Sequence, residues 1–196
     1  MKKCLFFAVL FVLILIVAQL EFLYQNIEKK EYMGIPYNVV DTNTYFSFMQ
    51  QAKQGHLLFT NKYTAEKVPY LLFNPVYLVI GWLTLFMHPV AAYYLFKFIF
   101  LIIFIFLVFK LLQLSVKKDE KCISLFFVLF GSGIGYFFIL LHNLNFKLYG
   151  SIDQWVSESN SVALNLAPVH FIVSVCLMII IVINYYKFWQ SKRISC

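Results

Sequence analysis

Long apolar runs alternate with two polar stretches along this chain. Each apolar run approaches or exceeds the roughly twenty residues that a helix needs to cross the hydrocarbon core of a bilayer. The runs cover residues 4–24, 90–112, 123–142 and 169–188, and the polar stretches cover 25–89 and 143–168. This pattern predicts an all-α integral membrane protein, in which about four transmembrane helices form one membrane domain over residues 1–196.

The first apolar run begins like a secretory signal sequence, because Lys2 and Lys3 precede an apolar core. However, residues 17–20 offer no small-x-small cleavage site, and the apolar character continues beyond them. The run therefore predicts an uncleaved transmembrane helix. The two lysines place its start in the cytoplasm by the positive-inside rule.

The segment 73–87 decides the topology. It is either a full span or a short helix at the outer membrane surface, and Pro75 suits the first turn of such a helix. If the segment does not span, the basic residues after the second and fourth runs all lie inside, as the positive-inside rule favours. These residues are Lys117, Lys118, Lys121, Lys187, Lys192 and Arg193. We therefore expect an interfacial or re-entrant helix at 73–87, in a multi-pass protein of a bacterial plasma membrane with a cytoplasmic N-terminus.

Three glycines stand at alternate positions in the third run, at Gly131, Gly133 and Gly135. In a membrane helix, small residues allow close helix packing, and glycine also permits a kink. A nucleotide-binding loop would need a longer glycine pattern between a strand and a helix. We expect packing or a kink here.

The composition supports the membrane class. Hydrophobic residues make up 62% of the 196 residues and charged residues only 13%, whereas a soluble domain is about half apolar and a quarter charged. The net charge of +7 therefore reports on topology and on contact with membrane lipid. We expect no nucleic-acid partner.

The cysteines carry no recognisable metal or redox motif. Cys4, Cys122, Cys176 and Cys196 form no CxxC pair, and none has a histidine at ligand spacing. We expect no disulfide and no metal–thiolate site. The cofactor stays unassigned, because no ligand motif supports a divalent metal.

The first polar stretch contains a predicted short helix at 41–55. Its apolar stripe recurs at spacings of three and four, in Tyr45, Phe48, Met49 and Ala52. Asp41 stands where an N-cap residue would stand, and Gly55 stands where a helix would stop. Two interpretations of Asp41 stay open: a cap that only stabilises the helix, and a carboxylate that performs acid–base chemistry.

The order of motifs resembles the N-terminal module of GT-C-type glycosyltransferases, including the protein O-mannosyltransferase and lipid A aminoarabinose transferase branches. An Asp-x-x-x-Tyr motif precedes a glycine, a Pro-x-Tyr motif opens a short helix that ends near another glycine, and a basic residue follows in the outer third of a span. The matching residues are Asp41, Tyr45, Gly55, Pro75, Tyr77, Gly81 and Lys97. The second polar stretch resembles a bacterial subgroup of the same superfamily in Trp155, Glu158, Ser161, Pro168 and His170.

Two departures qualify this resemblance. Thr42 follows Asp41 where many relatives have an acidic pair, which argues against metal binding there. Family members also carry about twice as many spans as the runs found here. We expect a fragment, a degraded copy, or a chain that works with a separately encoded C-terminal portion.

The resemblance implies inverting transfer of a sugar from a polyprenyl-phosphate donor to an acceptor outside the cytoplasm. Asp41 would be the general base, and Lys97 would contact the donor phosphate, unless its amine snorkels to the headgroups. Tyr45 would stack on a sugar, or serve only as an interfacial aromatic.

The remaining candidate site residues lie at the second polar stretch. Asp153 and Glu158 would orient the acceptor or hold a divalent ion, unless they are solvated loop acids, and His170 is a substrate contact or an interfacial histidine. The competing classes are a non-catalytic membrane scaffold or subunit and a small transporter.

Overall fold

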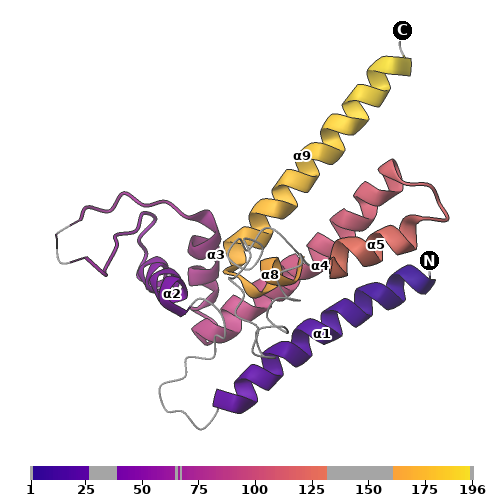
Figure 1. Ribbon diagram of the computed structural model, residues 1–196. Helices are drawn as coiled ribbons and strands as arrows, with labels where there is room; N and C mark the ends of the chain where they lie inside the picture. The colour runs from indigo at the N-terminus through magenta and orange to yellow at the C-terminus, as the bar shows by residue number, and fades with distance from the viewer. Residues whose placement is uncertain (1, 27–38, 65, 67, 132–160, 195–196) are drawn as a thin grey trace, which may run out of the picture.

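The structure is a computed structural model (Figure 1), and it describes residues 2–26, 39–64, 66, 68–131 and 161–194. Within these residues the only strand-like feature is an isolated antiparallel bridge between Phe59 and Leu72. The helices are α1 (Lys2–Asn26), α2 (Val39–Lys53), α3 (Pro75–Leu83), α4 (Pro89–Ser115), α5 (Lys121–Phe130), α8 (Ser161–Leu166) and α9 (Val169–Ile194). The predicted all-α class is confirmed for this part of the chain.

Two of the helices in the described ranges are long and apolar enough to cross a membrane. They are α4 and the Val169–Ser191 part of α9. Both coincide with predicted spans. The apolar helical stretch at the start of α1 is shorter, Lys3–Val17, and α5 has ten residues. The other two predicted spans therefore stay predictions.

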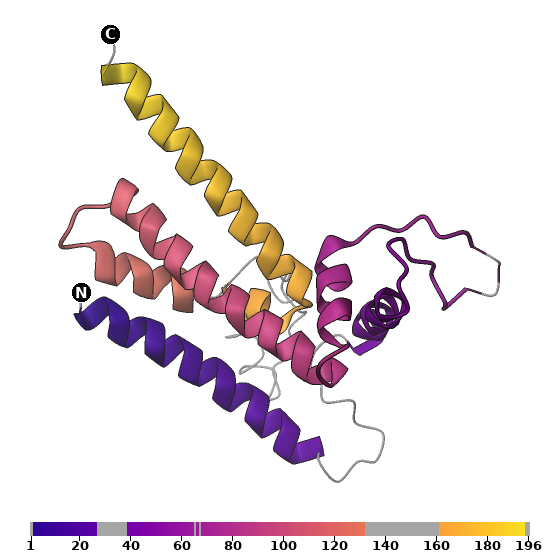
Figure 2. The same cartoon turned by 180° about the vertical axis from the view of Figure 1, so that it is seen from behind.

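The long helices are α1, α4 and α9. α1 runs antiparallel to α4, and the short α5 turns back to pack against both (Figures 1 and 2). α9 starts beside the N-terminal part of α4, packs along it, and then diverges. The N-terminus, the α4–α5 turn and the C-terminus all lie on the side away from α2 and α3.

Apolar side chains at helical spacing explain how α1, α4 and α5 pack. Leu125 and Leu129 lie four residues apart on α5, and both are buried. Phe11 of α1 is also buried, and its ring meets that of Phe130 edge-on, with the centroids 5.4 Å apart. Many outward-facing side chains of these helices are large and apolar, as expected for surfaces that face lipid.

Gly131, the first glycine of the pattern, follows the end of α5. α5 ends at Phe130, and the Gly131 N–H donates to the Phe127 carbonyl at 2.7 Å. A Cβ at Gly131 would collide with the same carbonyl, so only glycine fits this ending. α5 therefore ends within the predicted span 123–142. Residues 132–142 of that predicted span lie outside the described ranges.

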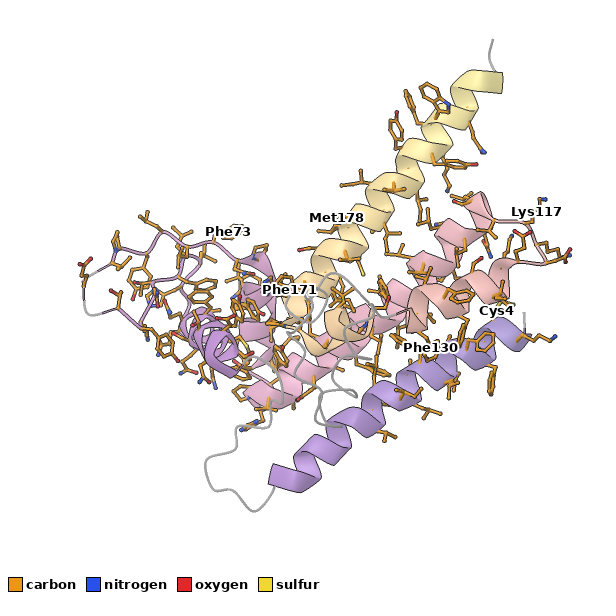
Figure 3. The ribbon with its side chains drawn as sticks, in the orientation of Figure 1. Cys4, Phe73, Lys117, Phe130, Phe171 and Met178 are labelled. Carbon is orange, nitrogen blue, oxygen red and sulfur yellow. A yellow bond between two sulfur atoms is a disulfide. The ribbon has the colours of Figure 1, made fainter. Side chains whose placement is uncertain are left out.

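Cys4 and Cys122 form a disulfide, with their Cα atoms 4.9 Å apart. The expectation of no disulfide was wrong. It followed from the predicted topology, which places Cys4 and Cys122 at cytoplasmic ends, whereas in the structure the antiparallel α1 brings its first turn to the start of α5 and the two thiols are joined. Figure 3 shows Cys4 and Lys117 on the side of the molecule opposite Phe73. Cys176 is a buried thiol within α9.

Candidate functional site

The predicted helix at 41–55 is present as α2, with one change at its start. The helix begins at Val39, so Asp41 lies in the first turn and is not the N-cap. A carboxylate in the first turn still interacts favourably with the helix dipole. The predicted stripe is confirmed, since Phe48, Met49 and Ala52 are buried and Tyr45 is half-buried.

Gly55 ends α2 as predicted. Its φ of 91° lies in the left-handed region that glycine adopts without strain. The N–H of His56 donates to the Gln51 carbonyl at 3.1 Å, and the N–H of Gly55 donates to the Ala52 carbonyl at 3.0 Å. These two bonds form a Schellman motif, which satisfies carbonyls at the helix end.

Gln51 fixes the loop that follows α2. Its side chain is fully buried, and its amide pairs with Thr60 as a strand would: Nε2 donates to the Thr60 carbonyl at 3.0 Å, and Oε1 accepts from the Thr60 N–H at 2.9 Å. The bridge between Phe59 and Leu72 then returns the chain toward α3. Sequence reasoning missed Gln51, although it stands three residues after Phe48, on the edge of the apolar stripe.

The segment 73–87 contains α3, which does not span. Its nine residues extend about 13 Å, less than half the thickness of a hydrocarbon core. Asn74 caps the helix by accepting the Tyr77 N–H at 3.4 Å, and Pro75 occupies the first turn as predicted. A short helix is therefore present in this segment, and its place at the outer membrane surface stays a prediction.

Gly81 allows α2 and α3 to cross closely. A Cβ at this position would lie 2.7 Å from the Met49 carbonyl oxygen and would also collide with the Ala52 Cβ. Any larger residue would separate the two helices. The crossing brings Tyr45 of α2 and Tyr77 of α3 into contact.

Tyr45, Tyr77 and His170 form one cluster from three elements, which we call the aromatic cluster. The two tyrosine rings stack with centroids 4.4 Å apart and planes 4° from parallel. The Tyr77 hydroxyl lies 3.0 Å from His170 Nδ1, and the Tyr45 ring meets the imidazole edge-on at 4.9 Å. The cluster therefore connects α2, α3 and the first turn of α9.

Burial keeps the phenols of the cluster protonated. Burial raises the pKa of Tyr77 far above its ordinary value, and the neighbouring Tyr93 and Tyr45 raise it further. A hydrogen bond with the His170 backbone lowers this pKa by a smaller amount. The pKa of Tyr45 is raised by burial first and by the Asp41 charge second. A protonated Tyr77 can donate to Nδ1 when the imidazole of His170 carries its proton on Nε2.

Asp41 lies beside this cluster, one helical turn before Tyr45. Its side chain is exposed, and its charge acts on the Tyr45 phenol. An exposed carboxylate next to a partly buried aromatic surface can accept a proton from a bound hydroxyl.

Lys97 points into the bundle. Its side chain is 7% exposed, Nζ donates to the Ala167 carbonyl at 3.0 Å, and Nζ lies 5.8 Å from the centre of the Tyr93 ring. Ala167 is three residues before His170, so the amine contacts the chain segment that leads into the aromatic cluster. Snorkelling to the headgroups does not describe this side chain.

Asn165 is the second polar group near the amine. It is 2% exposed, and its Nδ2 donates to the Ser161 carbonyl at 2.7 Å. Among the described residues its Oδ1 is buried and lacks a hydrogen-bond partner. Asn165 and Lys97 line a common pocket of about 160 Å³. Sequence reasoning missed Asn165, because a single asparagine in an apolar stretch has no motif.

The remaining candidate residues cannot be placed. Asp153, Trp155 and Glu158 lie outside the described ranges, so their predicted roles stay predictions. Within the part of the chain that the structure describes, no three His, Cys, Asp or Glu side chains gather as a metal site would require. Asp41, Tyr45 and His170 come together, and Lys97 lies close to the segment before His170.

Comparisons of this chain with family models, curated proteins and solved structures found no match.

Proposed function

We propose that this chain is a GT-C-like membrane glycosyltransferase, or the N-terminal module of one. It transfers a sugar from a polyprenyl-phosphate donor to an acceptor outside the cytoplasm. The observation that carries the proposal is that Asp41 acts on the aromatic cluster, while the Lys97 amine is held at Ala167, three residues before His170. A carboxylate, a flat aromatic surface and a buried cation are the groups that such a transfer needs.

The proposed reaction is a single displacement. The Asp41 carboxylate removes the proton from an acceptor hydroxyl, and the acceptor oxygen attacks the anomeric carbon of the donor sugar. The bond between this carbon and the phosphate oxygen breaks on the opposite face. Polyprenyl phosphate leaves with the electron pair, and the Lys97 ammonium stabilises its negative charge.

The aromatic cluster positions the sugar in this proposal. Tyr45 is half-buried, so one part of its ring is available for stacking while the other packs on Tyr77. The Tyr77–His170 hydrogen bond holds the imidazole and orients Nε2–H as a donor. We propose that Nε2–H binds a sugar hydroxyl.

The proposal includes a topology. The chain spans a bacterial plasma membrane several times, with its N-terminus in the cytoplasm and the α2–α3 region outside. Its support is that Cys4, in the first turn of α1, and the exposed Lys117 lie on one side of the molecule and α2 and α3 on the other (Figure 3).

Sugar transfer in membranes tests the function. The full chain is expressed, and transfer from a radiolabelled polyprenyl-phosphate sugar is compared for the unchanged protein, Asp41→Asn and Asp119→Asn. Asp119 is the matched control, because it is an exposed aspartate at the opposite end. We expect Asp41→Asn to lower transfer by about 10²- to 10⁴-fold, the usual contribution of a general base, and Asp119→Asn to leave it unchanged.

Equal transfer by all three proteins would remove Asp41 as the base. No transfer by any of them would favour the non-catalytic scaffold or subunit, provided that a C-terminal portion encoded nearby has been supplied.

A further inference from the structure

The segment between α2 and α3, residues 56–73, forms a small lobe that extends away from the long helices (Figures 1 and 2). We call it the α2–α3 lobe, and its described residues are 56–64, 66 and 68–73. The bridge between Phe59 and Leu72 joins its two arms. The Thr60 hydroxyl also donates to the Val68 carbonyl at 2.8 Å, from one arm to the other. These bonds hold the arms together, so the backbone defines where their side chains point.

The lobe has a buried face and an exposed apolar face. Phe59 is fully buried, and its ring stacks on that of Phe48 with the centroids 5.1 Å apart. In extended chains the residues on either side of a bridged pair point to the opposite face. Leu58, Leu71 and Phe73 flank the bridge in this way, and they are 41%, 71% and 63% exposed. These three side chains are therefore outside the core that the lobe makes with α2.

Further exposed apolar side chains lie on the lobe, on α3 and just beyond it. They are Leu57, Tyr63, Tyr70, Trp82, Leu85 and Phe86. Exposed apolar surface of this extent marks a contact with a membrane or with another protein. Tyrosine and tryptophan are enriched at the boundary between lipid and water. The composition therefore favours a membrane boundary over open water.

The contacts of α3 place it where two long apolar helices begin. The Tyr77 hydroxyl lies 3.0 Å from Nδ1 of His170, the second residue of α9, and the Val169–Ser191 part of α9 is long enough to span. At the other end of α3, a short connection leads from Leu83 to Pro89, the first residue of α4. In the proposed topology α4 and α9 enter the membrane at these ends. α3 then lies at the outer boundary of the bilayer, and the lobe begins at the same depth.

The direction of the lobe identifies what it contacts. The lobe leaves α2 and α3 sideways, away from α1, α4 and α9, so it lies beside the helix bundle and not over it (Figures 1 and 2). At the depth of α3, the space beside the bundle belongs to lipid. The lobe therefore continues the apolar surface that α4 presents to the bilayer through exposed residues such as Phe98 and Ile102.

The charges of the lobe decide which part of the lipid matters. They are those of Lys62, Glu66 and Lys67, which sum to +1. Lys62 and Glu66 are both exposed, so they offset each other at the surface. Burial of apolar side chains, rather than attraction to anionic headgroups, is then the main contribution to the contact.

We propose that the α2–α3 lobe is a lipid-contact surface, which inserts Leu58, Leu71 and Phe73 into the outer leaflet at the top of the acyl chains. The partner is ordinary membrane phospholipid. This inference goes beyond the proposed function, because it uses the topology given there but none of the residues assigned to sugar transfer. The contact fixes α2, which carries Asp41 and Tyr45, at a defined depth.

Quenching by nitroxide lipids tests the contact. In the full chain with its four cysteines changed to serine, Leu71→Cys or Lys53→Cys carries an environment-sensitive NBD label. Lys53 is the matched control, because it is an exposed residue in the last turn of α2. Each protein is placed, one copy per disc, in phosphatidylcholine nanodiscs that contain a phospholipid with a nitroxide near the top of its acyl chain.

We expect this lipid to quench the label at position 71 several times more than the label at position 53. Iodide in the water should show the reverse order. Quenching at position 71 should persist whether or not the discs contain phosphatidylglycerol, since the lobe carries little net charge.

Three outcomes would overturn the inference. Equal quenching at the two positions would mean that the lobe stands in water. Quenching at position 71 only with phosphatidylglycerol present would mean attraction to headgroups without insertion. Shielding of position 71 from both lipid and iodide would mean that protein covers the lobe.

The two proposals can fail separately. Lipid quenching at position 71 in a chain without Asp41-dependent sugar transfer would leave the lipid contact and remove the enzyme. Asp41-dependent transfer together with equal quenching at positions 71 and 53 would leave the enzyme and remove the lipid contact.

Discussion

The two ends of this molecule differ in the kind of side chain that they present. The end that contains the first turn of α1 and the α4–α5 turn is basic, with exposed lysines at Lys3, Lys117 and Lys118. The end that contains α2, α3 and the start of α9 is aromatic, and the contacts of Tyr45, Tyr77 and His170 hold it together. The basic end adds a disulfide to the apolar packing of α1 on α5, whereas the described contacts of the aromatic end are non-covalent.

This difference teaches where chemistry is possible. Lysines at the basic end are solvated charges, which face the cytoplasm in the proposed topology. At the aromatic end, burial keeps phenols protonated, and an exposed carboxylate stands beside them. Only the second arrangement brings an acid–base group to a surface that can bind a ligand. The predictions below test the comparison in order of decreasing effect.

The largest expected effect is an all-or-none difference in labelling. In a chain whose four cysteines are changed to serine, a single cysteine is introduced as Lys53→Cys or as Asp119→Cys, both at exposed positions. We expect a membrane-impermeant maleimide to label position 53 in intact cells and position 119 only after permeabilisation. Labelling of both positions from outside, or the reverse order, would contradict the proposed topology.

The disulfide gives the next largest effect. Reduction of the purified protein should lower its free energy of unfolding by about 2–4 kcal/mol. The reason is that the disulfide restricts the unfolded chain, since it joins residues with a sequence separation of 118. Thermal unfolding with and without reductant measures this. Cys176→Ser, which leaves the disulfide intact, should respond to the reductant as the unchanged protein does.

The redox state of Cys4 and Cys122 in the cell tests the proposed orientation in the membrane. The basic end faces the cytoplasm in our proposal, and the cytoplasm keeps thiols reduced. Alkylation at the moment of lysis, followed by intact-mass measurement, should therefore find Cys4 and Cys122 as thiols. An oxidised pair would place the basic end outside.

A smaller effect is expected at the α2–α3 crossing. Gly81→Val introduces atoms where the Met49 backbone lies, so it should cost about 1–3 kcal/mol, as overpacking commonly does. Thermal unfolding in detergent measures the loss. Val79→Ile is the control, because Val79 is an exposed residue of the same helix. A loss that is equal in both variants would mean that the crossing is not close.

Local features of this fold could be predicted from the sequence. The stripe of Phe48, Met49 and Ala52, the stop at Gly55 and the helix start at Pro75 depend on neighbours within a turn or two of the chain. The lengths of α4 and α9 follow from apolar runs of sufficient length. Each of these features depends on residues close together in the chain and on helix geometry, so a single sequence is enough to predict it.

Contacts between distant residues could not be predicted. Tyr77 and His170 are 93 residues apart, Lys97 and Ala167 are 70 apart, and the disulfide joins residues 118 apart. Nothing local distinguishes these pairs, since each depends on which helices pack together and in which register. For this reason Asp41 and His170 were found as separate candidates, while the direction of Lys97 and the role of Asn165 came only from the structure.

The smallest expected effect concerns one hydroxyl in the aromatic cluster. Tyr77→Phe removes the donor to His170 Nδ1 and leaves the ring stack with Tyr45 in place. A single hydrogen bond contributes about 1 kcal/mol, and the variant loses the bond between the Tyr77 hydroxyl and the half-buried His170, so we expect a cost of about 1–2 kcal/mol at neutral pH. Unfolding in denaturant measures it, and Tyr63→Phe, at an exposed tyrosine, is the control.

Alkaline pH sharpens this prediction. Because the pKa of Tyr77 is raised in the folded protein, the folded state keeps its proton when the unfolded phenol, with a pKa of about 10, has lost it. The contribution is fully present below that pH and falls as the pH rises above it. Tyr77→Phe lacks this group, so its free energy of unfolding should fall less steeply above about pH 10 than that of the unchanged protein, and the two curves should approach each other. Parallel curves would mean that Tyr77 titrates as a solvated phenol, and the aromatic end would then be no better shielded from water than the basic one.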